Sequence, residues 1–171
     1  GRWVKAYDPT RLLHYEASIY DSAGYHNDVS MLDVMSRMYA DTEWVKEYCE
    51  DRRMRKPFIQ CEFIHAMGNG PGDIHDYMEL MYKYDKFCGG FVWEWCDHAT
   101  WEGKASDGRD IFHYGGDAGE FPHDGNFCMD GLVYPDRRPH TGLLEWKNEI
   151  RPVHAAGKDL AAGTVELWNV Q

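Results

Sequence analysis

The chain has 171 residues, of which 43% are hydrophobic and 27% are charged, so it is long and apolar enough to form a globular domain with its own core. A formal net charge of −11 at pH 7 argues against nucleic acid and anionic membrane surfaces as partners. No apolar run approaches the roughly 18 residues of a membrane span, and no signal peptide is visible, so we expect a cytoplasmic protein.

Five cysteines are scattered along the chain without Cys-x-x-Cys spacing. This pattern favours reduced, buried thiols over a zinc ribbon or a disulfide framework. Aromatic residues make up 15% of the chain, a content that suits both a packed core and a cleft that stacks on sugar rings.

The first third of the chain predicts two strands and one helix. Residues 12–16 and 34–40 are the strand candidates, and the polar, Gly-containing segment 17–30 between them reads as a loop. Thr42 is a suitable N-cap for an amphipathic helix over 43–53.

The clearest β/α pattern follows. Pro57 opens a mostly apolar strand over 57–62, which predicts burial on both faces, as in a parallel sheet. A Gly-rich loop, a helix over 73–85 and a second buried strand over 88–93 come next. Strand, helix and strand in this order predict a right-handed crossover and parallel pairing.

The second half of the chain is less regular. Residues 97–140 show no periodicity, and a loop of that length in a compact domain is usually functional. A helix is predicted over 140–149, and the alternating segment 164–170 reads as a strand exposed on one face.

Glu62 is the residue that most requires an explanation, because it ends a buried strand. A buried carboxylate is costly unless it is paired or used, and in α/β barrels the strand ends are where the chemistry occurs. Taken alone, a Glu at such a position is more often the partner of an arginine in a structural ion-pair network than a catalytic residue.

The spacing of Glu62 and His65 matches the Glu-x-x-His pair of carboxylate-bridged metal proteins, but that motif requires a helix and a second copy. The sequence has no Gly-x-Ser-x-Gly elbow, which argues against a Ser/His/Asp triad. Its Gly-rich loop lacks the lysine of a P-loop, which argues against phosphate binding of that kind. Carboxylate chemistry remains, and it favours a glycosidase, which needs two carboxyl groups across the sugar. The carboxylates at or near predicted strand ends are Glu16, Glu62, Glu94 and Asp97.

Several longer motifs resemble the β-galactosidases of glycoside hydrolase family 2, in the right order and over nearly the whole chain. The most specific is Cys-Glu-Phe-Ile-His-Ala-Met-Gly-Asn at 61–69, which resembles the nucleophile segment of these enzymes. The others are Asp-Pro-Thr-Arg at 8–11, Tyr-Glu at 15–16, Met-Tyr-Ala at 38–40, Gly-Gly-Phe-Val-Trp-Glu-Trp at 89–95, Tyr-Gly-Gly-Asp at 114–117 and Asn-Phe-Cys-Met-Asp-Gly-Leu-Val at 126–133.

The resemblance implies an α/β fold, a partial (β/α)₈ TIM barrel holding about strands five to eight. Residues 1–152 would form the C-terminal half of the catalytic barrel, and 153–171 a linker and the first strand of a following β-sandwich domain. Because the chain begins with Gly1 rather than Met, we expect the natural N-terminus elsewhere.

The resemblance also implies residue roles in a retaining glycosidase that hydrolyses terminal β-D-galactosides such as lactose. Glu62 would be the nucleophile that forms the galactosyl-enzyme, and Tyr39 would hydrogen-bond this carboxylate and help to keep it ionised. His65 would bind galactose hydroxyls and stabilise the transition state, and Trp93 would form the apolar sugar platform.

Two kinds of metal ion are implied as well. The Phe127 carbonyl and Asp130 would line a monovalent-cation site, for Na⁺ or K⁺, beside the galactose 6-hydroxyl. The best-known members carry Asn at the position of Asp130, so cation affinity would differ here. Mg²⁺ would bind in the full enzyme to ligands outside this chain.

The general acid/base of the family is a Glu in an Asn-Glu pair on strand four, and no match precedes Glu62. Asn148-Glu149 lies in the terminal helix and is interpreted as a decoy. We therefore expect a piece of a longer, homo-oligomeric enzyme that is inactive by itself. The alternative is a non-catalytic carbohydrate-binding or assembly module on a degenerate barrel.

Overall fold

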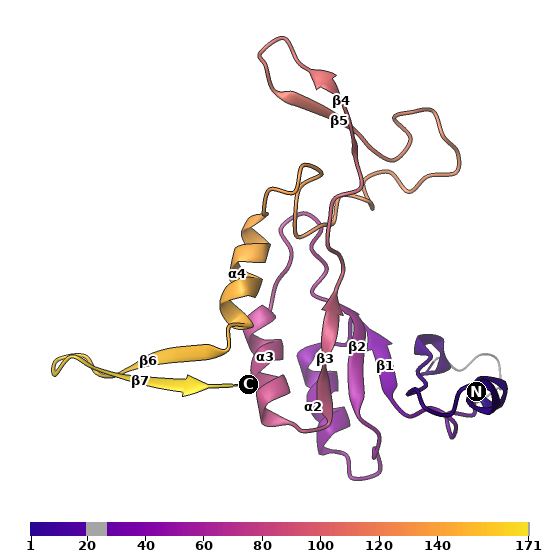
Figure 1. The fold of residues 1–171 in the computed structure, drawn as a ribbon, viewed down its shortest axis with the longest axis vertical. Coiled ribbons are helices and arrows are strands. Elements are labelled where there is room, and N and C mark those ends of the chain that lie inside the picture. The colour runs from indigo at the N-terminus through magenta and orange to yellow at the C-terminus, as the bar shows by residue number, and fades with distance from the viewer. Residues whose placement is uncertain (20–26, 171) are drawn as a thin grey trace.

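The computed structural model describes residues 1–19 and 27–170, and its centre is a three-stranded parallel sheet with the strand order β1-β2-β3 (Figure 1). The strands are β1 (Met35–Met38), β2 (Phe58–Phe63) and β3 (Phe87–Val92). Helix α2 (Thr42–Glu50) connects β1 to β2, and helix α3 (Ile74–Lys83) connects β2 to β3. The predicted strand–helix–strand units and their parallel pairing are confirmed.

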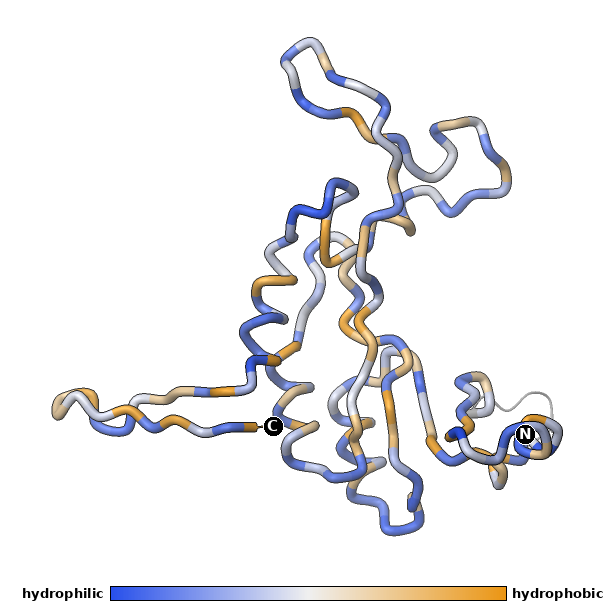
Figure 2. Tube along the Cα trace, in the orientation of Figure 1, coloured by the Kyte–Doolittle hydropathy of each residue, from blue (hydrophilic) through white to orange (hydrophobic). Residues whose placement is uncertain are grey.

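The core lies where α2 and α3 pack against this sheet. Phe58 is fully buried, and its ring centroid lies 5.1–5.5 Å from the rings of Tyr48, Trp44 and Phe87. Figure 2 shows apolar segments on the central strands, and others on α4 and on the β6–β7 hairpin. Fully burying such large apolar side chains stabilises the fold by about 1.5–3 kcal/mol each.

A buried amide ties β2 to the segment that follows β1. Gln60 is 0% exposed, and its side chain donates to the Ala40 carbonyl at 2.6 Å and accepts from the Ala40 N–H at 2.9 Å. The Tyr77 hydroxyl donates to the same carbonyl at 2.8 Å. Because these bonds satisfy a buried backbone group, they hold residue 40, and with it Tyr39, in one place.

The expected strand over 12–16 is wrong. The structure shows no strand there; instead Glu16 begins the 3₁₀ helix η1 (Glu16–Ile19), and the Leu13 carbonyl accepts the Asp33 N–H at 2.8 Å. A strand needs a hydrogen-bonded neighbour along its length, and this segment pairs with none of the described strands. The predicted loop 17–30 lies partly outside the described residues.

Helix boundaries differ from the predictions by a few residues. Asp41, not Thr42, caps α2, since its side chain accepts the Trp44 N–H at 2.7 Å. Asp and Thr are both favoured N-cap residues, so the sequence alone does not identify which of the two begins the helix. Helix α4 (Thr141–Glu149) is confirmed within the predicted range.

The region predicted to be irregular contains a β-hairpin of β4 (Thr100–Lys104) and β5 (Asp110–His113). Its turn includes Asp107-Gly108, a dipeptide typical of hairpins, which is the signal for this element in the sequence. Short helix α1 (Arg2–Tyr7) completes the N-terminal part.

The C-terminal segment is a hairpin of β6 (Val153–Asp159) and β7 (Thr164–Asn169), which projects away from α3 and α4 (Figure 1). The predicted strand over 164–170 is thus confirmed, and its partner strand was not foreseen. The division of the chain at residues 152 and 153 and the assignment of the hairpin to a β-sandwich stay predictions.

The prediction of reduced, buried cysteines is confirmed in part. All five thiols are free, with Cys49 and Cys96 buried but Cys88 exposed, so the prediction of burial is wrong for Cys88. Among residues 1–19 and 27–170, no helix has the length and apolar character to cross a bilayer.

Candidate active site

The predicted site residues gather at the carboxyl ends of the three parallel strands. Tyr39 follows β1, Glu62 is the penultimate residue of β2, and Trp93 follows β3. Parallel strands place their carboxyl ends at one edge of the sheet, so residues far apart in sequence meet there. The expected juxtaposition is therefore present in the described structure.

Tyr39 contacts Glu62 directly. Its hydroxyl donates to Glu62 Oε2 at 3.0 Å, and its backbone N–H donates to the Glu62 carbonyl at 2.9 Å. Tyr39 has φ +48°, a left-handed conformation that costs a non-glycine residue free energy and is found at functional sites. Burial, and then the Glu62 carboxylate, raise the pKa of Tyr39, so its hydroxyl stays protonated and remains a donor.

His65 lies beside this pair. Its ring meets the Tyr39 ring edge to face, with centroids 5.7 Å apart. The backbone holds this position: the Ala66 N–H donates to the Trp93 carbonyl at 2.8 Å. Gly70 is required here because a Cβ would lie 1.9 Å from the His65 carbonyl oxygen.

Asp130, which is distant in sequence from Trp93 and His65, contacts both side chains. The Trp93 indole Nε1–H donates to Asp130 Oδ2 at 3.1 Å, and His65 Nε2 lies 3.4 Å from the same oxygen. Asp130 is 1% exposed, whereas Trp93 is 40% exposed. A buried carboxylate thus fixes an indole whose surface is partly open to a ligand.

Phe127 lies at the margin of the site, with its ring centroid 6.5 Å from that of His65. Asp130 Oδ1 is buried and accepts no hydrogen bond from an N–H or hydroxyl group of the described residues, so a donor or a cation would satisfy it. Among the described residues, no cluster of three or more His, Cys, Asp and Glu side chains could hold a metal ion.

Glu94 lies beside Asp130, close to the predicted site residues, although the family resemblance implied no role for it. Burial, and then the neighbouring Asp130 carboxylate, raise the pKa of Glu94 above its ordinary value. Its Oε2 lies 3.2 Å from His98 Nε2. The only signal in sequence was its position beside Trp93, at the end of a predicted strand.

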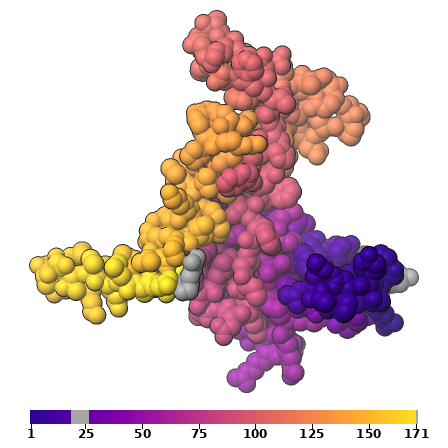
Figure 3. Space-filling model, viewed as in Figure 1, coloured from indigo at the N-terminus to yellow at the C-terminus, as the bar shows by residue number. Residues whose placement is uncertain are grey.

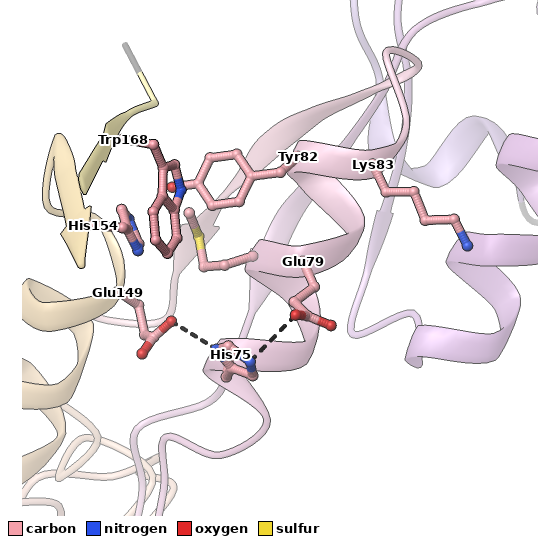
Figure 4. Close-up of a pocket in the computed structure, with 8 residues that line it drawn as sticks. His75, Glu79, Tyr82, Lys83, Glu149, His154 and Trp168 are labelled. Carbon is pink, nitrogen blue, oxygen red and sulfur yellow. Dashed lines mark hydrogen bonds and ion pairs between the residues drawn. The ribbon is translucent and has the colours of Figure 1, made fainter. Parts of the chain in front are cut away.

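Glu16 and Glu149, two other carboxylates noted in sequence, lie in helical segments and not at strand ends. Glu16 begins η1 rather than ending a strand. Glu149 pairs with His75 Nδ1 at 3.0 Å, and its interpretation as a decoy stays a prediction. The side chains of His75 and Glu149 line a cavity of about 450 Å³ between α3, α4 and the β6–β7 hairpin. Trp168 and His154 line the same cavity (Figure 4). None of the predicted site residues contributes to this cavity.

A parallel β/α unit with carboxylate, imidazole and indole side chains at the carboxyl ends of its strands has the organisation of an α/β barrel enzyme. Residues 1–155 match the family model described as glycosyl hydrolases family 2, TIM barrel domain. The chain belongs to this family, as the motifs had indicated.

Relatives support the same assignment. The chain is 54% identical over 153 residues to a beta-galactosidase of Actinobacillus pleuropneumoniae, covering 90% of this chain and 15% of the relative. It is 51% identical over 157 residues to a beta-galactosidase of Staphylococcus xylosus, covering 91% and 16%. The chain thus spans less than a fifth of the length of either relative.

One similar solved structure is Bacteroides uniformis beta-glucuronidase 2 covalently bound to cyclophellitol-6-carboxylate aziridine. It has a TM-score of 0.47 and 17% sequence identity, covering 92% of this chain and 20% of that one.

Proposed function

We propose that this chain carries the nucleophile of a retaining β-galactosidase that hydrolyses terminal β-D-galactosides such as lactose. The observation that carries the proposal is the 3.0 Å hydrogen bond from the Tyr39 hydroxyl to Glu62 Oε2, at the strand ends and beside His65 and Trp93. The beta-galactosidase names of the relatives support the choice of sugar.

In the proposed reaction, the Glu62 carboxylate forms a bond to the anomeric carbon while the glycosidic bond breaks. The leaving oxygen takes a proton from an acid/base carboxyl that we place in a preceding segment of the longer enzyme. Water then attacks the same carbon and gives its proton to that acid/base carboxylate, while the bond from the carbon to Glu62 breaks. Tyr39 orients the nucleophile through its hydrogen bond to Glu62 Oε2.

His65, Trp93 and Asp130 would hold the sugar. The exposed part of the Trp93 ring offers an apolar surface for the C–H face of galactose. His65 Nε2 and Asp130 Oδ2 lie 3.4 Å apart, so one sugar hydroxyl could contact both. Two fixed polar groups beside an aromatic platform select for hydroxyl orientation.

A monovalent cation, Na⁺ or K⁺, is proposed beside this site, held by the Phe127 carbonyl and Asp130. The unpartnered, buried Asp130 Oδ1 fits such an ion. When bound, the cation would supply positive charge to sugar oxygens. Mg²⁺ would bind to residues outside this chain.

The central test is Glu62→Gln in the full-length enzyme, with turnover of a chromogenic β-galactoside as the measurement. We expect kcat to fall on the order of a thousandfold or more, because no covalent intermediate can form. Glu43→Gln, which removes an exposed carboxylate on α2, is the matched control and should keep full activity. Turnover within a few-fold of wild type in Glu62→Gln would reject the assignment.

Tyr39→Phe is the graded companion variant. Loss of one hydrogen bond to a charged group, about 1.5–3 kcal/mol, should lower kcat about 10- to 150-fold. Tyr7→Phe, at an 86% exposed position, should have no effect.

Labelling by a 2-fluoro-galactoside should place the sugar on Glu62. A protein that binds the sugar but is not labelled would instead favour a non-catalytic carbohydrate-binding module.

A further inference from the structure

Asp97 is a buried carboxylate that the proposed reaction does not use. It is 4% exposed, and both of its oxygens are engaged at 2.8 Å. Oδ1 accepts the backbone N–H of Gly131, and Oδ2 bonds to His140 Nε2. Burying a carboxylate costs several kcal/mol unless its partners compensate, so these contacts define what Asp97 does in the fold.

The first contact fastens the backbone next to Asp130. The Asp130 carbonyl accepts the Glu94 N–H at 2.9 Å, and the Leu132 N–H donates to the Glu94 carbonyl at 2.9 Å. The two segments approach so closely that a Cβ on Gly131 would lie 2.1 Å from the Asp97 nitrogen. Asp97 therefore adds a side-chain bond at the point where the backbones are nearest.

The Asp130 carboxylate in turn holds the sugar-binding side chains. Its Oδ2 accepts the Trp93 indole N–H at 3.1 Å and lies 3.4 Å from His65 Nε2. A shift of the Gly131 amide would move Asp130 and, through it, the Trp93 platform. Outer residues of this kind control how precisely inner groups are oriented.

The second contact links Asp97 to α4. His140 precedes the first residue of that helix, and its ring stacks on Tyr134 with centroids 3.7 Å apart. The segment that leaves β3 also pairs with the segment that leads to α4, through the bridge between Cys96 and Val133. Asp97 is thus anchored on an imidazole that is partly buried and stacked on Tyr134.

We propose that Asp97 is a positioning residue of the sugar-binding site, fixing the Gly131 amide so that Asp130 stays aligned with Trp93 and His65. This inference rests on the proposed function. It predicts that Asp97 acts through Asp130, so that the two residues are energetically coupled.

The test is a double-mutant cycle in the full-length enzyme with a chromogenic β-galactoside. Asp97→Ala should lower kcat/KM about 10- to 100-fold, largely through KM, the range found for outer-shell partners. The double variant Asp97→Ala/Asp130→Ala should lose little more activity than Asp130→Ala alone. Asp136→Ala, an exposed aspartate of the same segment, should behave as wild type.

Asp97→Asn provides the readout that separates positioning from general stability. It retains an oxygen that can accept the Gly131 N–H. Its kcat/KM should therefore lie much closer to that of the wild type than to that of Asp97→Ala, even if the alanine variant folds poorly. Full additivity with Asp130→Ala, or an Asp97→Ala enzyme with unchanged KM and kcat, would overturn the inference. Unimpaired turnover by Glu62→Gln, assayed in parallel, would instead overturn the proposed function and the inference with it.

Discussion

Single residues acquire their roles here through partners distant in sequence. Tyr39 lies 23 positions before Glu62, and Asp130 lies 37 positions after Trp93, yet both pairs are hydrogen-bonded. The resemblance suggested all four residues. The contact between Trp93 and Asp130 was not predicted, because no local pattern relates a strand end to a residue deep within an irregular segment.

Glu94 provides a pH-dependent prediction at this scale. In the folded state, burial and the nearby Asp130 raise the pKa of Glu94 above the ordinary value of 4.5. His98 lowers this pKa, and Asp97 raises it by a smaller amount. The ionised carboxylate therefore weakens the folded state at high pH. This penalty disappears as pH falls through the folded pKa towards 4.5.

We expect Glu94→Gln to raise the apparent melting temperature at pH 8 by roughly 1–3 °C, since it removes a charge beside Asp130. The gain should shrink as the buffer approaches pH 5. Thermal scans of the full-length protein at several pH values measure this, with Glu43→Gln as the exposed control. A lower melting temperature at pH 8, or a difference independent of pH, would contradict the explanation.

At the scale of elements, the pairing of β2 with β3 depends on a glycine. Gly90 lies opposite Gln60, and a Cβ there would lie 2.8 Å from the Phe63 ring. Phe63 is fully buried between Tyr77 and Trp146, with ring centroids 5.5 and 5.9 Å away, so it has no free space to move into. The sheet tolerates no side chain at this position.

Gly90→Ala should therefore destabilise the protein by about 1–3 kcal/mol, the usual cost of overpacking a core. Because Phe63 follows Glu62 directly, galactosidase activity should fall as well. Gly72→Ala is the matched control, since a Cβ at that position meets nothing within 4 Å. Equal melting temperatures and activities for the two variants would show that Phe63 can move.

The whole molecule is extended. Its accessible surface is 12,125 Å², compared with about 8,700 Å² expected for a compact monomer of this mass. Figure 3 shows the reason: the N-terminal segment, the β4–β5 region and the β6–β7 hairpin all project from the centre. Within the described structure, β1 and β3 are also open edges of the sheet, and Phe91 on β3 is 66% exposed.

The isolated 171-residue chain should therefore self-associate and should not hydrolyse β-galactosides. Open strand edges and exposed aromatic side chains favour association. The proposed mechanism places its acid/base carboxyl in a preceding segment of the longer enzyme, so the isolated chain would lack that group. Light scattering and a chromogenic assay on the purified chain, with the full-length enzyme as control, measure both properties. A monomeric chain with substantial turnover would show that the site is complete.

The sequence by itself determined the β/α order of residues 34–93, the family and the central position of Glu62, because apolar periodicity and long contiguous motifs are local properties. Only the tertiary structure decided that residues 12–16 form no strand and that 100–113 form a hairpin. It alone also decided that Asp130 accepts the Trp93 indole N–H and that Asp97 accepts the Gly131 N–H. Strand formation and buried carboxylate pairing depend on neighbours supplied by distant segments. Those neighbours are identified only when the chain is folded.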